Sequence, residues 1–101
     1  MNYKLSALAK ADLRNIYMFS LSEFGEAISD NYLESLYAVF ETLARHPGIG
    51  LTPDFETDKA VRKFPALKHV IYYCIAPAGI EIRRLFHGSR EIDEFDIRPF
   101  E

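Results

Sequence analysis

The sequence is poor in the residues that mark several large classes of protein. Among its 101 residues there is one cysteine, Cys74, so no disulfide can form within the chain and nothing demands an oxidising compartment. Glycine and proline number five each, which excludes fibrous and low-complexity chains. No stretch approaches the ~20 apolar residues of a membrane span, and the N-terminus lacks the long apolar segment of a signal peptide. We therefore expect a cytoplasmic protein with no membrane partner.

Motifs of common enzyme and metal-binding classes are also missing. The sequence contains no glycine-rich phosphate loop, no GxSxG and no EF-hand calcium loop. It has no HxxxH or CxxC spacing, so we expect neither a metal nor a cofactor. Glu94 and Asp96 form a close acidic pair, but they stand in a polar tail, and we interpret them as solvated residues rather than a catalytic dyad.

The composition that remains is that of a single globular domain spanning residues 1–101. Hydrophobic residues make up 49% of the chain and charged residues 27%, a balance typical of folded proteins with a core. The formal net charge is −3, which by itself argues against an electrostatic nucleic-acid binder, because phosphate binding needs a basic surface.

Hydrophobic periodicity predicts a strand and then two helices in the first half of the chain. Residues 3–6 alternate as in a strand, and Ser6 is a plausible N-cap for a helix that ends at Gly25. A second helix is predicted over residues 26–45 and is ended by Pro47. The short link at Gly25 makes the two helices an antiparallel hairpin. Leu36 and Phe40 should face the helix–sheet core.

The second half changes to the pattern of strands. We predict strands over 61–64, ended by Pro65, over 68–75, and over 80–86 after a turn at 77–79. In the central strand Tyr72 and Tyr73 should point to opposite faces, and Cys74 reads as a small core residue. The tail from about residue 89 is acidic, with Phe95, Ile97 and Phe100 as isolated apolar anchors.

The resulting order is β-α-α-β-β-β, an α+β fold. It consists of an N-terminal strand, the helix hairpin and a three-stranded antiparallel meander. Runs of helices followed by runs of strands predict one antiparallel sheet with the helices packed on a face.

Charge is unevenly distributed along the chain. Residues 1–50 carry a net charge of −2 and the tail 89–101 carries −3, whereas residues 60–87 hold five cations against one acid, a net charge of +4. The sheet half is therefore basic inside an acidic protein. Solvated strand faces would explain this pattern, and so would an anion-binding face for RNA phosphate or an acidic protein partner. The predicted basic face comprises Arg62, Lys63, Lys68, Arg83 and Arg84.

Two histidines are candidates for acid–base chemistry. His69 begins one predicted strand and His87 ends the next, so a tight hairpin would bring them to the same end of the sheet. Histidine titrates near neutrality, which suits proton transfer. The alternative is that both histidines only cap strands by hydrogen bonds.

The chain resembles the ParE branch of the RelE/ParE toxin superfamily over about residues 3–90. The resemblance is carried by Tyr3-Lys4-Leu5-Ser6, by Ala11-Asp12-Leu13, by Phe40-Glu41-Thr42-Leu43-Ala44, by Arg62-Lys63-Phe64-Pro65 leading to His69-Val70-Ile71-Tyr72-Tyr73, and by Arg84-Leu85-Phe86-His87. Each piece alone is weak, but their order and spacing together are specific.

The resemblance implies a toxin of a type II toxin–antitoxin system, neutralised by a cognate antitoxin that wraps the helices and sheet. ParE-like members act on DNA gyrase and are not enzymes, whereas RelE-like members are ribosome-dependent mRNA endonucleases. A nuclease would draw its catalytic residues from Arg62, Arg84 and His87. No tyrosine follows Tyr73 in the sequence, and the C-terminal tail is acidic. Both features argue against a RelE-like nuclease, so we favour the gyrase inhibitor.

Several alternatives stay open at this point. They are the RelE-type nuclease and a degenerate, non-toxic module that only binds antitoxin. Direct nucleic-acid binding through the sheet is compatible with the charge pattern but is not favoured. The assembly, either a homodimer or a toxin–antitoxin hetero-oligomer, is not determined by the sequence.

Overall fold

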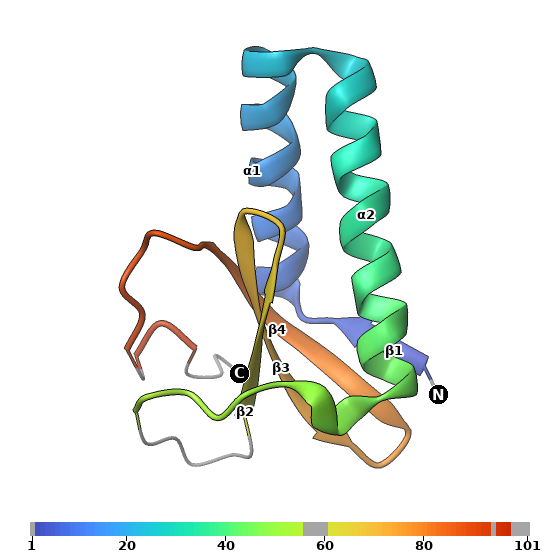
Figure 1. Ribbon diagram of the computed structural model, residues 1–101, viewed down its shortest axis with the longest axis vertical. Coiled ribbons are helices and arrows are strands. Elements are labelled where there is room, and N and C mark those ends of the chain that lie inside the picture. Colours follow the sequence, from blue (N-terminus) through green and yellow to red (C-terminus); the bar gives the residue numbers. More distant parts are fainter. Residues whose placement is uncertain (1, 56–60, 94, 98–101) are drawn as a thin grey trace.

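The computed structural model describes residues 2–55, 61–93 and 95–97, and the elements follow the predicted order (Figure 1). In chain order they are β1 (Asn2–Leu5), α1 (Ala7–Phe24), α2 (Glu26–Arg45), the short 3-10 helix η1 (Pro47–Ile49), β2 (Val61–Ala66), β3 (His69–Ala76) and β4 (Gly79–His87). The α+β class and the β-α-α-β-β-β order are thereby confirmed.

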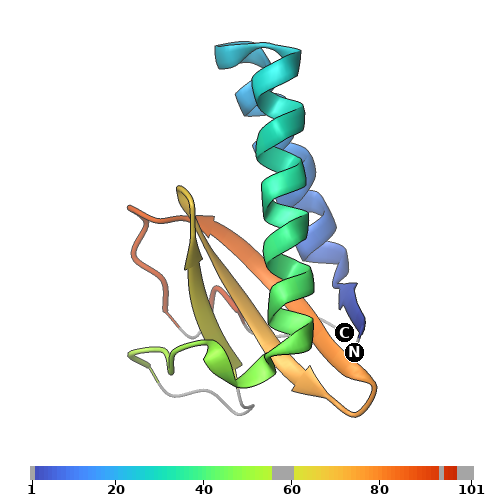
Figure 2. The ribbon, with the colours of Figure 1, turned by 45° about the vertical axis from the view of Figure 1, so that its right-hand side comes forward.

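The ends of the helices follow from single residues. The Ser6 side chain accepts a hydrogen bond from the Ala9 N–H at 3.0 Å, so Ser6 is the N-cap of α1. Gly25 has φ +84, a conformation that residues with a Cβ rarely adopt, and it both ends α1 and precedes α2. Because the link is a single residue, the helices run antiparallel, as predicted, and stand side by side in Figures 1 and 2.

The sheet is mixed rather than antiparallel, which corrects the sequence prediction. Its strand order is β1-β4-β3-β2, and the meander β2-β3-β4 is antiparallel as expected. However, β1 pairs with β4 in parallel, with Tyr3 opposite Ile80 and Leu5 opposite Ile82. Periodicity reveals that residues 3–6 form a strand, but the direction of its pairing depends on a neighbour more than seventy residues away.

Pro65 does not end its strand, because β2 continues to Ala66 at the edge of the sheet. Lys63 exchanges backbone hydrogen bonds with Leu51, so its N–H and C=O point away from β3. These directions alternate along a strand, and Pro65 therefore also has its nitrogen on the side away from β3. No ladder hydrogen bond is lost, which is why an edge strand tolerates proline there.

Each face of the sheet is covered by a hydrophobic cluster. On the helix side, Leu36, Phe40, Ile71 and Tyr73 are fully buried between the helices and the strands, as predicted for the first two. On the other side, called the outer face below, a smaller cluster consists of Val61, Tyr72, Cys74, Phe86 and Ile97. Tyr72 and Tyr73 therefore point to opposite faces, and Cys74 is a buried core residue, as predicted.

The C-terminal tail folds back onto the outer face (Figure 2). Of the predicted apolar anchors, Ile97 is 4% exposed and packs on this face, whereas Phe95 is 60% exposed, so its prediction as an anchor was wrong. Arg84 and Arg90 place their guanidinium carbons 4.5 and 4.6 Å from the centre of the Phe86 ring. The predicted anchor Phe100 and the acid Glu94 lie outside the described residues.

Candidate interaction groove

The cations of the predicted basic face are mostly paired within the molecule. Lys63 lies 3.7 Å from Asp54, and Arg83 lies 3.3 Å from Glu81. Lys68 stands 5.5 Å from the centre of the Phe24 ring. The cations of this segment are therefore held by partners within the molecule, and Asp54 is an acid that the fold brings to them.

The five cations also do not share one face. Arg62 is opposite Tyr73 in the β2–β3 register, so it lies on the helix side, where it donates to the Gly50 carbonyl at 2.9 Å. Lys63 is opposite Tyr72 and lies on the outer face. Arg84 is opposite Tyr72, on the outer face, because the register shifts by one residue between Tyr72 and Tyr73. Arg83 pairs with Glu81, which is opposite Cys74 on that same face.

Arg84 takes part in a network at the exposed edge of β4. Its Nε and Nη2 donate to the two carboxylate oxygens of Asp12 at 2.8 and 3.1 Å, and its Nη1 donates to the Asp96 carbonyl at 3.0 Å. Asp12 also accepts from the Leu85 backbone N–H at 2.9 Å. Because β1 ends at Leu5, the Asp12 carboxylate takes the place of a neighbouring strand along this part of β4.

Sequence reasoning missed this role of Asp12. One signal was available, since Asp12 belongs to the Ala11-Asp12-Leu13 motif that carried the family resemblance. A half-buried acid on a helix that covers a sheet edge is a natural partner for the unpaired edge N–H groups.

His69 and His87 lie together, as predicted. They are opposite each other at the end of the β3–β4 ladder, with ring centres 5.6 Å apart. The Tyr32 hydroxyl is 2.6 Å from Nδ1 of His69 and also accepts the Lys68 N–H at 3.1 Å. We therefore assign the Tyr32 hydroxyl proton to a hydrogen bond with a neutral His69. Burial, and then the neighbouring His87, lower the pKa of His69 below its usual value.

The residues considered for a nuclease are not gathered at one point. His87 is opposite His69, and Arg62 is opposite Tyr73, four residues further along β3. At the rise of a strand this separates them by about 13 Å along β3. Arg84 is on the outer face in contact with Asp12, whereas Arg62 is on the helix side.

The outer face also carries a pocket of about 430 Å³. It lies between Asp54 and Phe55 on one side and Arg90 and Glu91 of the tail on the other, over Tyr72. Phe55 stacks on Tyr72 with ring centres 6.4 Å apart. Both signs of charge line this pocket, so it does not form an anion site of the kind expected from the sequence.

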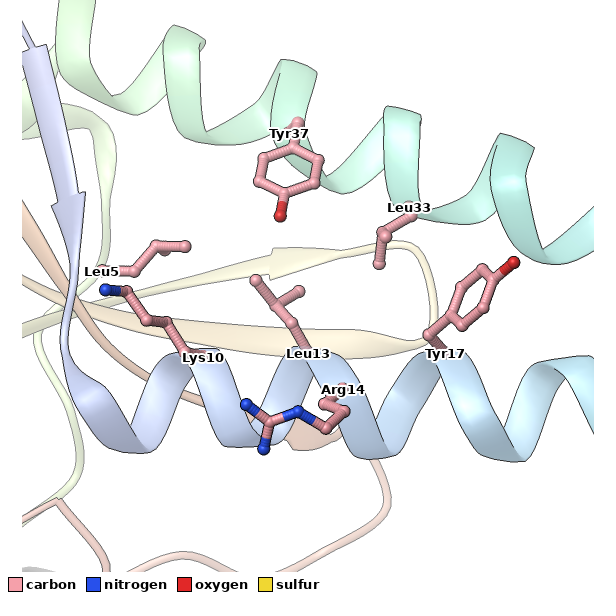
Figure 3. Close-up of a pocket in the computed structure, with 7 residues that line it drawn as sticks. All are labelled: Leu5, Lys10, Leu13, Arg14, Tyr17, Leu33 and Tyr37. Atoms are coloured by element: carbon pink, nitrogen blue, oxygen red, sulfur yellow. The ribbon is translucent and has the colours of Figure 1, made fainter.

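A second, more apolar depression of about 270 Å³ lies between the helices, and we call it the groove (Figure 3). Its floor is formed by Leu13 of α1, Leu33 of α2 and Leu5 of β1, and Tyr37 of α2 projects over it. Tyr17 lines its distal end, where its hydroxyl donates to Asp30 at 2.8 Å and links the two helices.

The α1 side of the groove is basic. Lys10 and Arg14 line it and are exposed. Neither forms an ion pair with any other described residue, in contrast to Lys63, Arg83 and Arg84 of the sheet. An apolar floor beside two unpaired cations makes the groove the best candidate site for a protein partner in the described part of the chain.

Comparisons with known proteins agree with this architecture. The family described as the ParE toxin of the type II toxin–antitoxin system parDE matches residues 3–92. Toxin ParE1 of Caulobacter vibrioides is 36% identical over 87 residues, which cover 86% of this chain and 88% of that protein. A solved structure titled "Chromosomal ParDE TA system from P. aeruginosa" superposes with a TM-score of 0.74 at 19% identity, covering 86% of this chain and 95% of that chain.

The fold defines a small α+β protein with a groove along its helical hairpin. The chain belongs to the ParE family of toxins of type II toxin–antitoxin systems. Among the described residues, no helix combines the length and apolarity needed to cross a membrane.

Proposed function

We propose that this toxin inhibits DNA gyrase in the cytoplasm and is neutralised by a cognate antitoxin bound in the groove. The observation that carries the proposal is the match to the ParE family over residues 3–92, nearly the whole chain. The toxin would act by binding gyrase rather than by catalysing a reaction of its own.

The groove suits an antitoxin segment that folds as it binds. Leu5, Leu13 and Leu33 offer an apolar floor, and burying side chains there would supply the free energy that orders a flexible segment. The floor is held by packing, since Leu13 is 5% exposed in the main core and Leu5 and Leu33 pack against that core. The partner would therefore adapt to the toxin rather than the reverse.

The distribution of the sheet cations favours gyrase inhibition over RNA cleavage. Cleavage at a 2′-hydroxyl needs a base, an acid and cations near one phosphate. Arg62 and Arg84 lie on opposite faces of the sheet, and the Arg84 guanidinium is held by Asp12. A net charge of −3 is also unfavourable for approach to ribosomal RNA.

A supercoiling assay tests the proposal directly. We expect the purified toxin to reduce supercoiling of relaxed plasmid by purified DNA gyrase, and an added stoichiometric amount of antitoxin to restore it. Unchanged supercoiling at a large molar excess of toxin would contradict the gyrase proposal. New cuts within codons of mRNA from expressing cells, mapped by primer extension, would instead identify the nuclease, and expression without any growth defect would identify a non-toxic module.

A further inference from the structure

The distal part of the helix hairpin has small polar residues inside and large apolar residues outside. It extends past the end of the sheet in Figures 1 and 2. Ser20 of α1 and Ser29 of α2 are buried there, with their hydroxyl oxygens 2.8 Å apart. By contrast, Phe19, Phe24 and Ile28 are 66%, 51% and 55% exposed. Folding alone would favour the reverse arrangement, because burying an apolar side chain stabilises a protein and burying a hydroxyl does not.

Phe19 lies on the side of α1 that faces the sheet. It follows Asp12 by seven residues, about two helical turns, and Asp12 accepts the Leu85 N–H of β4. Residues seven apart share one side of a helix. Phe19 therefore continues the sheet-facing side of α1 into the distal part of the hairpin.

Phe24 and Ile28 lie on the same side of the hairpin. Ile28 precedes Tyr32 by one helical turn, and the Tyr32 hydroxyl accepts the N–H of Lys68 in the turn between β2 and β3. The centre of the Phe24 ring is 5.5 Å from the Lys68 ammonium nitrogen. Leu67, in the same turn, is exposed as well. We call these four exposed apolar residues the apolar shelf: Phe19, Phe24, Ile28 and Leu67.

The hairpin around the shelf is acidic. Residues 15–44 contain five acids and no lysine, arginine or histidine, which gives a net charge of −5. Glu23 follows Phe19 by one helical turn and is exposed, so it borders the shelf. A partner that binds here needs an apolar contact for the shelf and basic residues around that contact.

We propose that the apolar shelf, with the acidic hairpin around it, is the surface through which this toxin binds DNA gyrase. The inference rests on the proposed function, because it takes the target to be gyrase, and it adds the surface that makes the contact. Gyrase acts on DNA, and a surface that binds DNA must be basic to neutralise phosphates. The acidic hairpin is complementary to such a surface, and the shelf supplies the apolar contact beside it.

A second copy of the toxin fits this surface less well than gyrase does. In a symmetric dimer the same patch meets itself. Two hairpin segments, each with a net charge of −5, would then lie close together, and like charges repel. A basic partner meets no such repulsion.

The shelf and the groove lie on opposite sides of α1. Tyr17 lines the distal end of the groove, two residues before Phe19. Side chains two residues apart point about 200° away from each other around a helix. An antitoxin segment in the groove therefore thickens the hairpin and hinders its approach to gyrase without covering the shelf. Substitutions in the shelf should accordingly leave antitoxin binding intact.

The first test is inhibition of supercoiling by purified gyrase. We compare the wild type with Phe19→Gln/Ile28→Gln, which removes apolar side chains from the shelf and keeps the net charge. The control is Ile49→Gln/Leu51→Gln, which changes two exposed apolar residues outside the hairpin. Thermal unfolding verifies that each variant is folded, and the dissociation constant with the antitoxin of the adjacent reading frame is measured for each.

We expect Phe19→Gln/Ile28→Gln to raise the toxin concentration for half-maximal inhibition about 10- to 100-fold, the range for apolar anchors of an interface. The control should change this concentration by less than about twofold. Neither variant should change the dissociation constant with the antitoxin by more than about twofold.

A second pair of variants tests the charge. Glu23→Lys reverses an acid beside the shelf, and Glu91→Lys makes the same change in net charge at an exposed position in the tail. We expect Glu23→Lys to weaken inhibition more than Glu91→Lys does, and the difference to shrink at high salt, because salt screens surface charges.

The outcomes separate this inference from the proposed function. If the wild type inhibits gyrase and the shelf variants inhibit as strongly as their controls, the shelf is not the gyrase surface and the proposed function stands. Loss of antitoxin binding or of self-association in Phe19→Gln/Ile28→Gln, with inhibition unchanged, would assign the shelf to that partner and overturn the inference. A wild-type toxin that leaves supercoiling unchanged would remove the proposed function and this inference together.

Discussion

At the scale of single residues, Asp12 shows how one side chain can replace a missing strand. It accepts the Leu85 N–H and two hydrogen bonds from Arg84 where β1 no longer covers β4. The Asp12 and Arg84 side chains are 14% and 19% exposed, so the pair is shielded from most of the solvent. Its loss should therefore cost more than the loss of a surface ion pair.

We expect Asp12→Ala to lower the free energy of unfolding by about 3 kcal/mol, between the values for exposed and buried pairs. The substitution leaves the Arg84 guanidinium and the Leu85 N–H without their partner. Chemical denaturation measures the change, with Glu23→Ala as the control, since Glu23 is an exposed acid on the same helix. Equal stability of the two variants would show that Asp12 does not support the edge.

His69 predicts a dependence of stability on pH. Burial and His87 lower the pKa of folded His69, while Asp12 acts weakly in the opposite direction. The unfolded chain therefore binds a proton at this site first as the pH falls. The contribution of neutral His69 to folding is complete above a pH of about 6.5, the ordinary histidine pKa, and is lost as the pH falls from that value through the lower pKa of the folded protein.

Denaturation midpoints at pH 7.5 and pH 5.5 measure this effect. We expect the wild type to lose stability between these values and His69→Gln to lose less, because Gln can still accept the Tyr32 hydrogen bond but does not titrate. The same slope in both proteins would assign the pH dependence to other groups.

At the scale of elements, α2 contributes four residues to the buried helix-side core, against two from α1. Phe40 is fully buried and packs against the rings of Tyr3 and Tyr37, with ring centres 5.5 and 5.6 Å away. It thus joins β1 to α2. The same residue holds Tyr37 beside the groove, so this packing also shapes the candidate site.

We expect Phe40→Ala to lower the free energy of unfolding by about 3–5 kcal/mol, the cost of a large cavity in a core. Phe19→Ala is a matched control, since Phe19 is 66% exposed on α1. Denaturation midpoints that fall equally for the two variants would mean that the buried face of α2 is assigned wrongly.

Prediction from sequence succeeded for these elements because the signals are local. The steps that bury Leu36 and Phe40, and the stop at Gly25, are properties of neighbouring residues. It failed for the parallel pairing of β1 and for the end of β2, which was predicted at Pro65. Both depend on the order of the strands in the sheet, which places β1 and β2 at its edges. The groove was missed for the same reason, because its lining comes from three separate elements.

At the scale of the whole molecule, the fold determines which charged side chains are paired with each other. The sequence places a net charge of +4 in residues 60–87, which suggested a basic sheet. In the structure Asp12 and Asp54, which come from outside this segment, pair with Arg84 and Lys63, and Glu81 within it pairs with Arg83. Lys10 and Arg14, which form no ion pair with any described residue, instead lie on an acidic hairpin, where they line one side of the groove.

The sequence by itself determined the order and bounds of the helices, the core residues of α2 and the opposite faces of Tyr72 and Tyr73. These follow from backbone periodicity and from single residues such as Ser6 and Gly25, which act on their immediate neighbours. Only the tertiary structure decided the direction of β1, the neutralisation of the sheet cations and the existence of the groove. Each of these depends on residues from distant parts of the chain that come together in the fold. Local sequence patterns do not encode contacts of that kind.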